Sequence, residues 1–476
     1  MTEDLLSRNQ VLASFFFFRR GGSDRNKIAR LFPTLASQVA AVSPQFKEAL
    51  HRSLDGMSKD EIEKKSITKQ FEILMSTPLQ ATTAMVSGTA PKVLVIDALD
   101  ECDDFNRVDT EEGRKLLETL LNLFSRLAHI GNARLRILLT SRSDPYIVET
   151  MIENDLVLPF DLDHQDLIID TRVDIRTFLT QRLVRISKAK RLKGDWPSRR
   201  DLEYLFERAN DPEPLFIYAA TFILFIEGKG RTANPKSQLQ KWITQSGGSA
   251  SRLGPIYEPV INQALGDAED DDGEELGRLM LFLGALCLLV QPLSEEAIAE
   301  LLGFESDGVR QWITSLHAVL VVEGSEDYVR LRHKSFSDFL LESQSAEFHV
   351  TGPKIHNELA QLCILQMQAG LEHNVCKLKD PSVEHADFSW ETVCSCISEE
   401  MRYACEHWVH HLLRSNLQPL DKMWDFIEEH FLHWLEVMSL LGLVPQAIEA
   451  TSALLEDLRV RTPQLLLGST TNPDTL

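Results

Sequence analysis

The sequence has 476 residues, of which 43% are hydrophobic and 25% are charged, a balance typical of a globular chain that buries a core. A chain of this length is expected to form about three or four domains. Its net charge of −22 at pH 7 opposes nonspecific binding to nucleic acid or to an anionic membrane.

Membrane and targeting segments are not predicted. The longest apolar run, Leu279 to Val290, has 12 residues, whereas a membrane span needs about 20. The apolar stretch from Phe15 to Phe18 is too short for a signal peptide, and the acids Glu3 and Asp4 precede it. The seven cysteines show no paired metal-binding spacing and are predicted to be free thiols in a reducing compartment. We therefore expect a cytoplasmic protein.

The first elements along the chain alternate between strand and helix. Val11 to Phe17 is predicted to be a strand, and Lys27 to Val42 is predicted to be an amphipathic helix. The basic loop between them, Arg19 to Arg25, contains two adjacent glycines; it is either a solvated turn or a loop that approaches a phosphate. Further helices are predicted from Pro44 to about Met75.

A group of carboxylates follows the next predicted strand. Val93 to Asp97 is predicted to be a short buried strand. Its carboxyl end carries Asp97, Asp100 and Glu101, with Asp103 and Asp104 beyond them. Open α/β sheets bind ligands at this end of their strands, where one carboxylate can hold Mg²⁺ and another can position a water beside a phosphate. The alternative is an ordinary strand followed by a polar turn.

A second predicted buried strand, Leu135 to Leu139, ends in two hydroxyls and Arg142. An arginine at this edge can contact a terminal phosphate bidentately. A long helix, Glu111 to Ile130, is predicted to join the two strands, and Leu156 to Phe160 is a candidate for a further strand. This alternation of strand and helix predicts a doubly wound parallel sheet.

Several segments in this order resemble the NACHT domain of STAND NTPases, the signalling ATPases related to NOD-like receptors, and most closely those of fungi. The segment with the acids resembles Walker B, and the segment with Arg142 resembles sensor 1. The similarity runs from near residue 10 to about residue 415. The segments that carry it are Ser14 to Arg19, Leu31 to Ala36, Val95 to Cys102, Leu139 to Asp144 and His333 to Leu340.

The resemblance implies a site for Mg-ATP or ADP in which Asp97 holds Mg²⁺, Asp100 or Glu101 positions the attacking water, and Arg142 senses the terminal phosphate. The phosphate cradle of such proteins, G-x-x-x-x-G-K-[ST], is absent from the sequence. In the family it precedes the segment that resembles Val11 to Phe17, so we expect an N-terminally truncated domain without Walker A. Most nucleotide-binding energy comes from that missing part, and tight binding or autonomous hydrolysis of ATP is therefore not expected.

The middle of the chain is predicted to be helical, with linkers. Asp161 to Asp170 is predicted to be an acidic linker, with helices from Thr171 onward. Gly228 to Gly254 is predicted to be a linker, and Asp267 to Glu275 an exposed acidic loop. The other helices predicted here are Arg199 to Ala209, Leu215 to Glu227 and Leu279 to Val290.

Two residues in this part have roles implied by the resemblance alone. Pro214 stands where the family's small helical domain faces the adenine, although Pro212, Glu213 and Pro214 replace a turn that is usually glycine-rich. A helix-breaking turn is the other interpretation. His333 matches a position that senses nucleotide or locks the domains together, and the alternative for it is a structural histidine at an interface.

A winged helix is predicted after the acidic loop. Its helices end near His317, and its hairpin pairs Val319 to Val322 with Tyr328 to Leu331. The second helix of the turn offers Arg310 as its cation, and the wing tip carries three acids. Since neutralisation of phosphates dominates DNA affinity, a winged helix that packs against protein is favoured over one that binds DNA.

The last part of the chain is predicted to be helical. A cluster of histidines, His407, His410 and His411, raises the alternative of a metal site. Trp408 stands where the glutamate of H-E-x-x-H would be, so a structural or solvated role is favoured. Family members often carry repeats beyond this point. The predicted helices are Ile355 to Gln368, Ile397 to Leu413, Met423 to Leu441 and Pro445 to Val460.

The predicted fold class is α/β followed by mostly α: an incomplete, P-loop-NTPase-like doubly wound parallel sheet, a helical domain, a winged helix and a C-terminal helical region. The resemblance implies a NACHT/STAND-type signalling or oligomerisation module, of the kind linked to fungal innate immunity or heterokaryon incompatibility, without its own ATPase activity. The alternative is an ATP-binding or weakly hydrolysing NTPase whose P-loop is supplied in trans or is missing from a truncated gene model. The expected partners are proteins, including further copies or other NACHT proteins. The predicted domains are 1–165, 166–245, 246–348 and 349–476.

Overall fold

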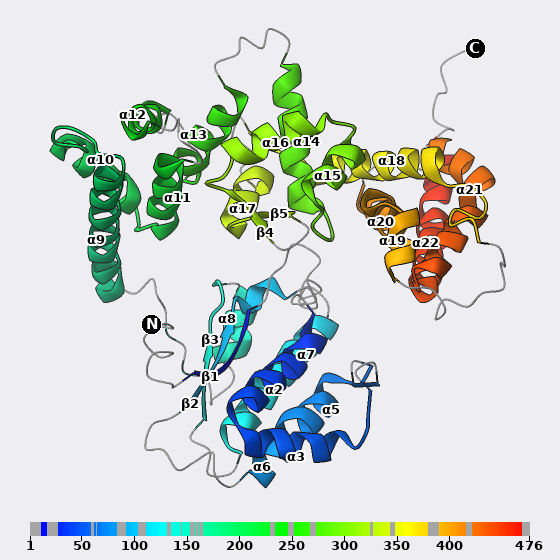
Figure 1. Cartoon of the computed structure of the whole chain (residues 1–476). Helices are drawn as coiled ribbons and strands as arrows, with labels where there is room; N and C mark the ends of the chain where they lie inside the picture. The colour runs from blue at the N-terminus through cyan, green and yellow to red at the C-terminus, as the bar shows by residue number, and fades with distance from the viewer. Residues whose placement is uncertain are drawn as a thin grey trace. The chain divides into compact units, whose positions relative to one another are not determined.

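The chain divides into two compact units, Met1–Asp161 and Leu162–Leu476, and each is described by itself. Figure 1 shows the elements of both units in chain order. The computed structural model describes residues 11–16, 27–58, 61–62, 64–82, 92–102, 111–130, 135–143, 145–152, 158, 160, 165–228, 234–245, 252–266, 273–323, 327–342, 348–378, 390–415 and 421–468.

A three-stranded sheet forms the centre of the first unit. Its strands are β1 (Val11–Phe16), β2 (Lys92–Asp97) and β3 (Leu135–Leu139), in the order β1-β2-β3, and both pairs are parallel. In β2, Leu94, Val95 and Ile96 are buried, as a central strand of a parallel sheet requires. The predicted alternation of strand and helix around a parallel sheet is confirmed.

Two helices pack directly on this sheet, α2 against β1 and α7 against β3, and other helices of the unit pack on α2 and on one another (Figure 1). Leu31, Leu35 and Val39, four residues apart, are fully buried on one face of α2, and Phe32 packs edge-on against Phe71. The helical elements are η2 (Ile28–Arg30), α2 (Leu31–Val42), α3 (Pro44–Leu54), α5 (Ile67–Phe71), the π-helical η3 (Glu72–Ser76), α6 (Thr77–Ala81), η4 (Leu99–Glu101), α7 (Glu111–Ala128) and α8 (Pro145–Ile152).

Two predictions about strands of this unit, the burial of β3 and a strand at Leu156 to Phe160, differ from the structure or fall mostly outside the described residues. The prediction that β3 is a buried strand holds for Leu135 alone, because Arg136 is exposed and Ile137 to Leu139 are half-buried. Among the described residues β3 lies at an edge of the sheet, which leaves one side of it without a neighbouring strand. The strand predicted at Leu156 to Phe160 lies mostly outside the described residues, and Leu158 and Phe160 themselves are exposed and not in a strand. The loop from Arg19 to Arg25 also lies outside them.

The second unit begins with a long helix where a linker is predicted. α9 starts at Gln165, so the prediction of an acidic linker is wrong for residues 165–170; nothing there breaks a helix, and acids are favourable near a helix N-terminus. Ser198 and Asp201 form a capping box at the start of α10. The helices are α9 (Gln165–Ala189), α10 (Arg199–Asn210), α11 (Phe216–Glu227), α12 (Pro235–Gln245) and α13 (Gly254–Leu265).

The predicted linker from Gly228 to Gly254 contains the helix α12, so that prediction is also wrong. Trp242 of α12 is fully buried, and its Nε1 donates to the hydroxyl of Tyr218 at 2.8 Å. The rings of Phe222 and Phe225 lie 5.3 and 5.1 Å from the indole. Burial of a large aromatic residue against α11 stabilises α12 despite the polar sequence around it.

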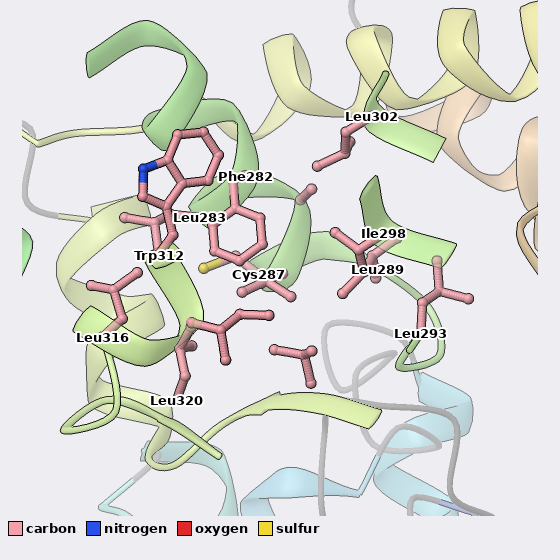
Figure 2. Close-up of a cluster of buried hydrophobic side chains, with 14 of the residues drawn as sticks. Phe282, Leu283, Cys287, Leu289, Leu293, Ile298, Leu302, Trp312, Leu316 and Leu320 are labelled. Carbon is pink, nitrogen blue, oxygen red and sulfur yellow. The ribbon is translucent and has the colours of Figure 1, made fainter. Parts of the chain in front are cut away.

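Three helices and a hairpin follow in the order predicted for a winged helix. β4 and β5 pair antiparallel across the predicted turn, and Ser294 caps α15. Figure 2 shows the core between them, with Phe282 and Trp312 packed together above Leu316 and Leu320. Glu274 and Glu275, predicted to lie in an exposed loop, instead form the first turn of α14. The elements are α14 (Glu274–Leu288), α15 (Glu295–Leu302), α16 (Ser306–Ser315), β4 (Leu320–Glu323), β5 (Tyr328–Leu331) and α17 (Lys334–Glu342).

The C-terminal part is helical, as predicted. Trp408 and Trp434 are buried with their rings 5.9 Å apart and join α20 to α21. Among the described residues, no helix combines the length and the apolar character needed to cross a membrane. The helices are α18 (Gly352–Gly370), α19 (Trp390–Cys396), α20 (Glu399–Arg414), α21 (Asp421–Leu440) and α22 (Val444–Gly468).

Candidate functional site at the carboxyl edge of the sheet

The acids after β2 and the hydroxyls after β3 meet at one edge of the sheet. β2 and β3 are parallel neighbours, with Ile96 opposite Leu139, so both chains reach the carboxyl edge at the same level. The backbone contacts continue past the strands, since Thr140 N donates to Ile96 O at 3.0 Å and Leu99 N donates to Thr140 O at 2.9 Å. The structure therefore brings the two predicted segments together.

The Asp97 side chain is hydrogen-bonded to Thr140, the residue that follows the neighbouring strand β3. The Thr140 hydroxyl donates to Asp97 Oδ1 and accepts from the backbone N–H of Ala98 at 3.0 Å. One hydroxyl thus uses its single proton on the carboxylate and a lone pair on the backbone. This hydrogen bond orients the carboxylate at the edge of the sheet.

Asp100 is bonded to Arg142. Its Oδ1 accepts from the backbone N–H of Arg142 at 3.1 Å, and its Oδ2 lies 3.8 Å from the Nε of the guanidinium. The Asp100 side chain is only 9% exposed, whereas the Arg142 side chain is 44% exposed. The arginine predicted to sense a phosphate therefore already faces a carboxylate.

A strained turn places Asp100 there. Ala98 adopts a left-handed conformation, with φ 56° and ψ 51°, which costs a non-glycine residue about 1 kcal/mol or more. Leu99 and Cys102 are fully buried and anchor the two ends of η4. This reversal turns Asp100 back toward β3, and Glu101 lies half-buried in the same turn. Asp103 and Asp104 lie outside the described residues.

The edge suits a hydrated Mg²⁺ better than it suits a triphosphate. Mg²⁺ in nucleotide sites is held by one or two carboxylates together with waters and phosphate oxygens, and Asp97 offers such a carboxylate. No group of three or more potential metal-binding side chains is found in the described part of the chain, so phosphates would have to complete the shell. The cation that these residues offer to a phosphate, Arg142, is engaged by Asp100. The residues at this edge therefore fit the Mg²⁺ of the implied ligand but not its phosphates.

Pro214 and His333 lie in the second unit, and each has a local role there. Pro214 belongs to the turn between α10 and α11, where Leu215 N donates to Ala209 O at 2.8 Å. His333 precedes α17, and its Nδ1 accepts from Ser335 N at 3.1 Å and lies 2.6 Å from Ser335 Oγ. That hydroxyl is also 2.6 Å from the Tyr257 hydroxyl. Their implied roles in nucleotide binding stay predictions.

The structure also bears on the alternative that the winged helix binds DNA. Arg310, the cation of the predicted recognition helix α16, pairs with Glu295 at 2.6 Å and with Asp307 at 3.3 Å. These two carboxylates reduce the positive charge available for a phosphate backbone. The pairing favours a winged helix that packs against protein.

Of the three histidines of α20, His411 belongs to a buried hydrogen-bond network. His411 is fully buried; its Nε2 lies 2.8 Å from the Tyr403 hydroxyl, and its Nδ1 lies 2.9 Å from Nδ1 of His356 on α18. The Tyr403 hydroxyl accepts from Val290 N at 3.2 Å. The network ties α18, α20 and the segment after α14 together.

Burial lowers the pKa of these histidines. Desolvation, with Arg414 adding repulsion, lowers the pKa of His356 to about 4. Burial in the first place, then Arg414 and His356, lower the pKa of His410 to about 3. The pKa of His411 is held well below its usual range, mainly by burial. The network is therefore neutral at pH 7.

Sequence reasoning missed the part played by Thr140. It is the first residue after β3 and bridges Asp97 to the backbone of Ala98. The available signal was the placement of a hydroxyl directly after the strand that pairs with the acidic one. The predicted site residues named only Arg142 from this segment.

Comparison with known proteins supports the resemblance for the first part of the chain. The family model described as Nephrocystin 3, N-terminal, matches residues 1–142, and that family is NACHT-related and STAND-like. The match covers less than a third of the chain and includes Asp97, Asp100, Glu101 and Arg142. No curated protein matches the chain. The narrower resemblance to fungal members stays a prediction.

Proposed function

We propose that this chain acts as a NACHT/STAND-type signalling or oligomerisation module that does not hydrolyse ATP by itself. The observation that carries the proposal is the bonding of Arg142 to Asp100, through a backbone hydrogen bond of 3.1 Å and a guanidinium contact of 3.8 Å. A phosphate at this edge has to compete with that carboxylate for the guanidinium. The acidic edge then serves to hold β2 and β3 together, and the module works through contacts with other proteins.

The sequence supports the same conclusion, because it lacks the loop that binds the phosphates in such proteins. None of the 476 residues forms a G-x-x-x-x-G-K-[ST] loop, which supplies the backbone amides and the lysine that bind the phosphates. A single arginine cannot replace these donors, because most of the charge stabilisation in phosphoryl transfer comes from them and from Mg²⁺. The proposed partners are proteins, among them a second copy of the chain.

A second function is favoured by the position of Asp97. It lies at the carboxyl edge of a parallel sheet, where α/β proteins bind nucleotides, and its carboxylate suits a hydrated Mg²⁺. In this alternative the chain binds ATP, or hydrolyses it weakly, once another polypeptide supplies the phosphate loop. Asp97 would hold the metal ion, and Asp100 or Glu101 would position water.

Isothermal titration of the purified 476-residue chain with Mg-ATP separates the two functions. If the chain is a module without ATPase activity, Mg-ATP should not bind with a Kd tighter than about 1 mM. Micromolar binding that is lost in Asp97→Asn would contradict it and would favour the second. The control is Glu48→Gln on α3, an exposed acid away from this edge, which should leave any binding unchanged.

A further inference from the structure

A groove in the first unit lies between α2 and α3 and has a volume of about 550 Å³. Small residues of α2 line one wall, among them Pro33, Ala36 and Ala40, which share one face because they are three and four residues apart. Leu50 and Leu54 of α3 line the opposite wall. The volume lies within the range of protein binding pockets.

The groove is closed below and open above. Leu74 and Ala36 are buried beneath it, whereas Leu50 and Ala40 are half-buried and Ala41 at its edge is exposed. An occupant can therefore bury one apolar face while its opposite face stays in water. An amphipathic helix has two such faces.

The described lining of the groove carries one fixed positive charge, Lys47, although the chain is strongly acidic. Lys47 and His51 are the ionisable side chains among the described lining residues, both are exposed, and they lie four residues apart on α3. No carboxylate belongs to that described lining. In a chain with a net charge of −22, this local reversal of sign favours an acidic partner over a basic one.

We propose that this groove binds an acidic amphipathic helix of a partner protein. The apolar face of that helix lies between α2 and α3, and its glutamates or aspartates face Lys47 and His51. The small side chains of α2 allow the backbone of the bound helix to approach closely, as in other helix-in-groove complexes. The open side of the groove leaves the polar face of the helix in solvent.

The test uses the full chain and two labelled synthetic helices of about 18 residues, a length at which an isolated helix can form. Both carry leucines at i, i+3, i+4 and i+7; one has glutamates beside the leucines and the other has lysines. By fluorescence anisotropy we expect the glutamate helix to bind at least about tenfold more tightly than the lysine helix, and the preference to shrink in high salt.

Two substitutions locate the binding site. Lys47→Glu should remove or reverse the preference, whereas Lys115→Glu, an exposed lysine of α7 with the same change in charge, should preserve it. Ala41→Trp places an indole at the edge of the groove and should weaken binding of the glutamate helix about tenfold. Circular dichroism and thermal unfolding confirm that each variant is folded.

Several results would overturn the proposal. They are no binding of the glutamate helix up to about 1 mM, equal binding of the two helices, or binding unchanged by both Lys47→Glu and Ala41→Trp. Self-association of the chain that Lys47→Glu abolishes, seen by sedimentation, assigns the groove to a second copy instead. Displacement of the helix by micromolar dodecanoate but not dodecylamine assigns it to a small apolar acid.

Discussion

Two polar clusters in this chain have opposite surroundings. The edge at Asp97 opens to solvent through Thr140, which is exposed, and Arg142, whose side chain is 44% exposed, although the Asp100 side chain itself is only 9% exposed. The network of Tyr403, His411 and His356 is buried, with all partners supplied by the protein. Both are rich in titratable groups, which in sequence alone suggest chemistry. Burial distinguishes them, because a cluster that holds no contact with solvent contributes to stability, whereas an exposed one can exchange partners.

The largest expected effect is in the buried network. Tyr403→Ala removes a fully buried ring and leaves the nitrogen of His411 without its hydroxyl partner, and it should lower the free energy of unfolding by about 3–5 kcal/mol. Urea unfolding measures the change. Asp97→Ala, at the solvent-facing edge, should cost about 1 kcal/mol or less. Similar costs at both positions would contradict the comparison.

Acid should also destabilise the buried network. The pKa of His356 is lowered to about 4 and that of His410 to about 3, so the unfolded chain binds protons more readily than the folded chain. The stabilisation is complete above pH 6.5 and is lost as the pH falls from about 6.5 to about 4 for His356 and to about 3 for His410. The expected slope is about 1.4 kcal/mol per pH unit for each proton.

Burial is the main cause of this acid sensitivity, and the contact between His356 and His411 adds to it at His411. Their Nδ1 atoms are 2.9 Å apart, so a proton can lie on one nitrogen but not on both. Urea unfolding at several pH values measures the slope. It should flatten in the variant His356→Gln, and an unchanged slope in that variant would contradict the assignment to these histidines.

The smallest expected effect is at the sheet edge. Thr140→Val keeps the shape of the side chain but removes the donor to Asp97 and the acceptor for Ala98 N. It should cost about 1 kcal/mol, measured by thermal unfolding, while Thr119→Val on α7, whose hydroxyl donates only within its own helix to Lys115 O, should cost less. A cost above about 3 kcal/mol would show that this edge is as integral to stability as the buried network.

Sequence periodicity predicted elements whose apolar residues repeat regularly. The buried face of α2, the β2 strand and the hairpin of β4 and β5 follow from such patterns. It failed where tertiary contacts decide, as in α12, whose polar sequence becomes helical because Trp242 is buried against Tyr218. α12 also begins with a proline, Pro235, a common first helical residue.

The sequence predicted which residues lie at the candidate site but not which of them contact one another. Parallel neighbouring strands place Asp97 and Arg142 at one edge, as predicted from their positions after two strands. The contact of Arg142 with Asp100 depends on the left-handed turn at Ala98, which no glycine or asparagine announced in the sequence. The role of His411 likewise depended on Tyr403 and on the distant His356.

The nucleotide content of the purified chain tests the central claim most directly. After denaturation and removal of the protein, the supernatant is separated by anion-exchange chromatography and compared with ADP and ATP standards. We predict far less than one nucleotide per chain, because Arg142 is engaged by Asp100 and the sequence supplies no phosphate loop. About one ADP per chain, released only on denaturation, would contradict the account.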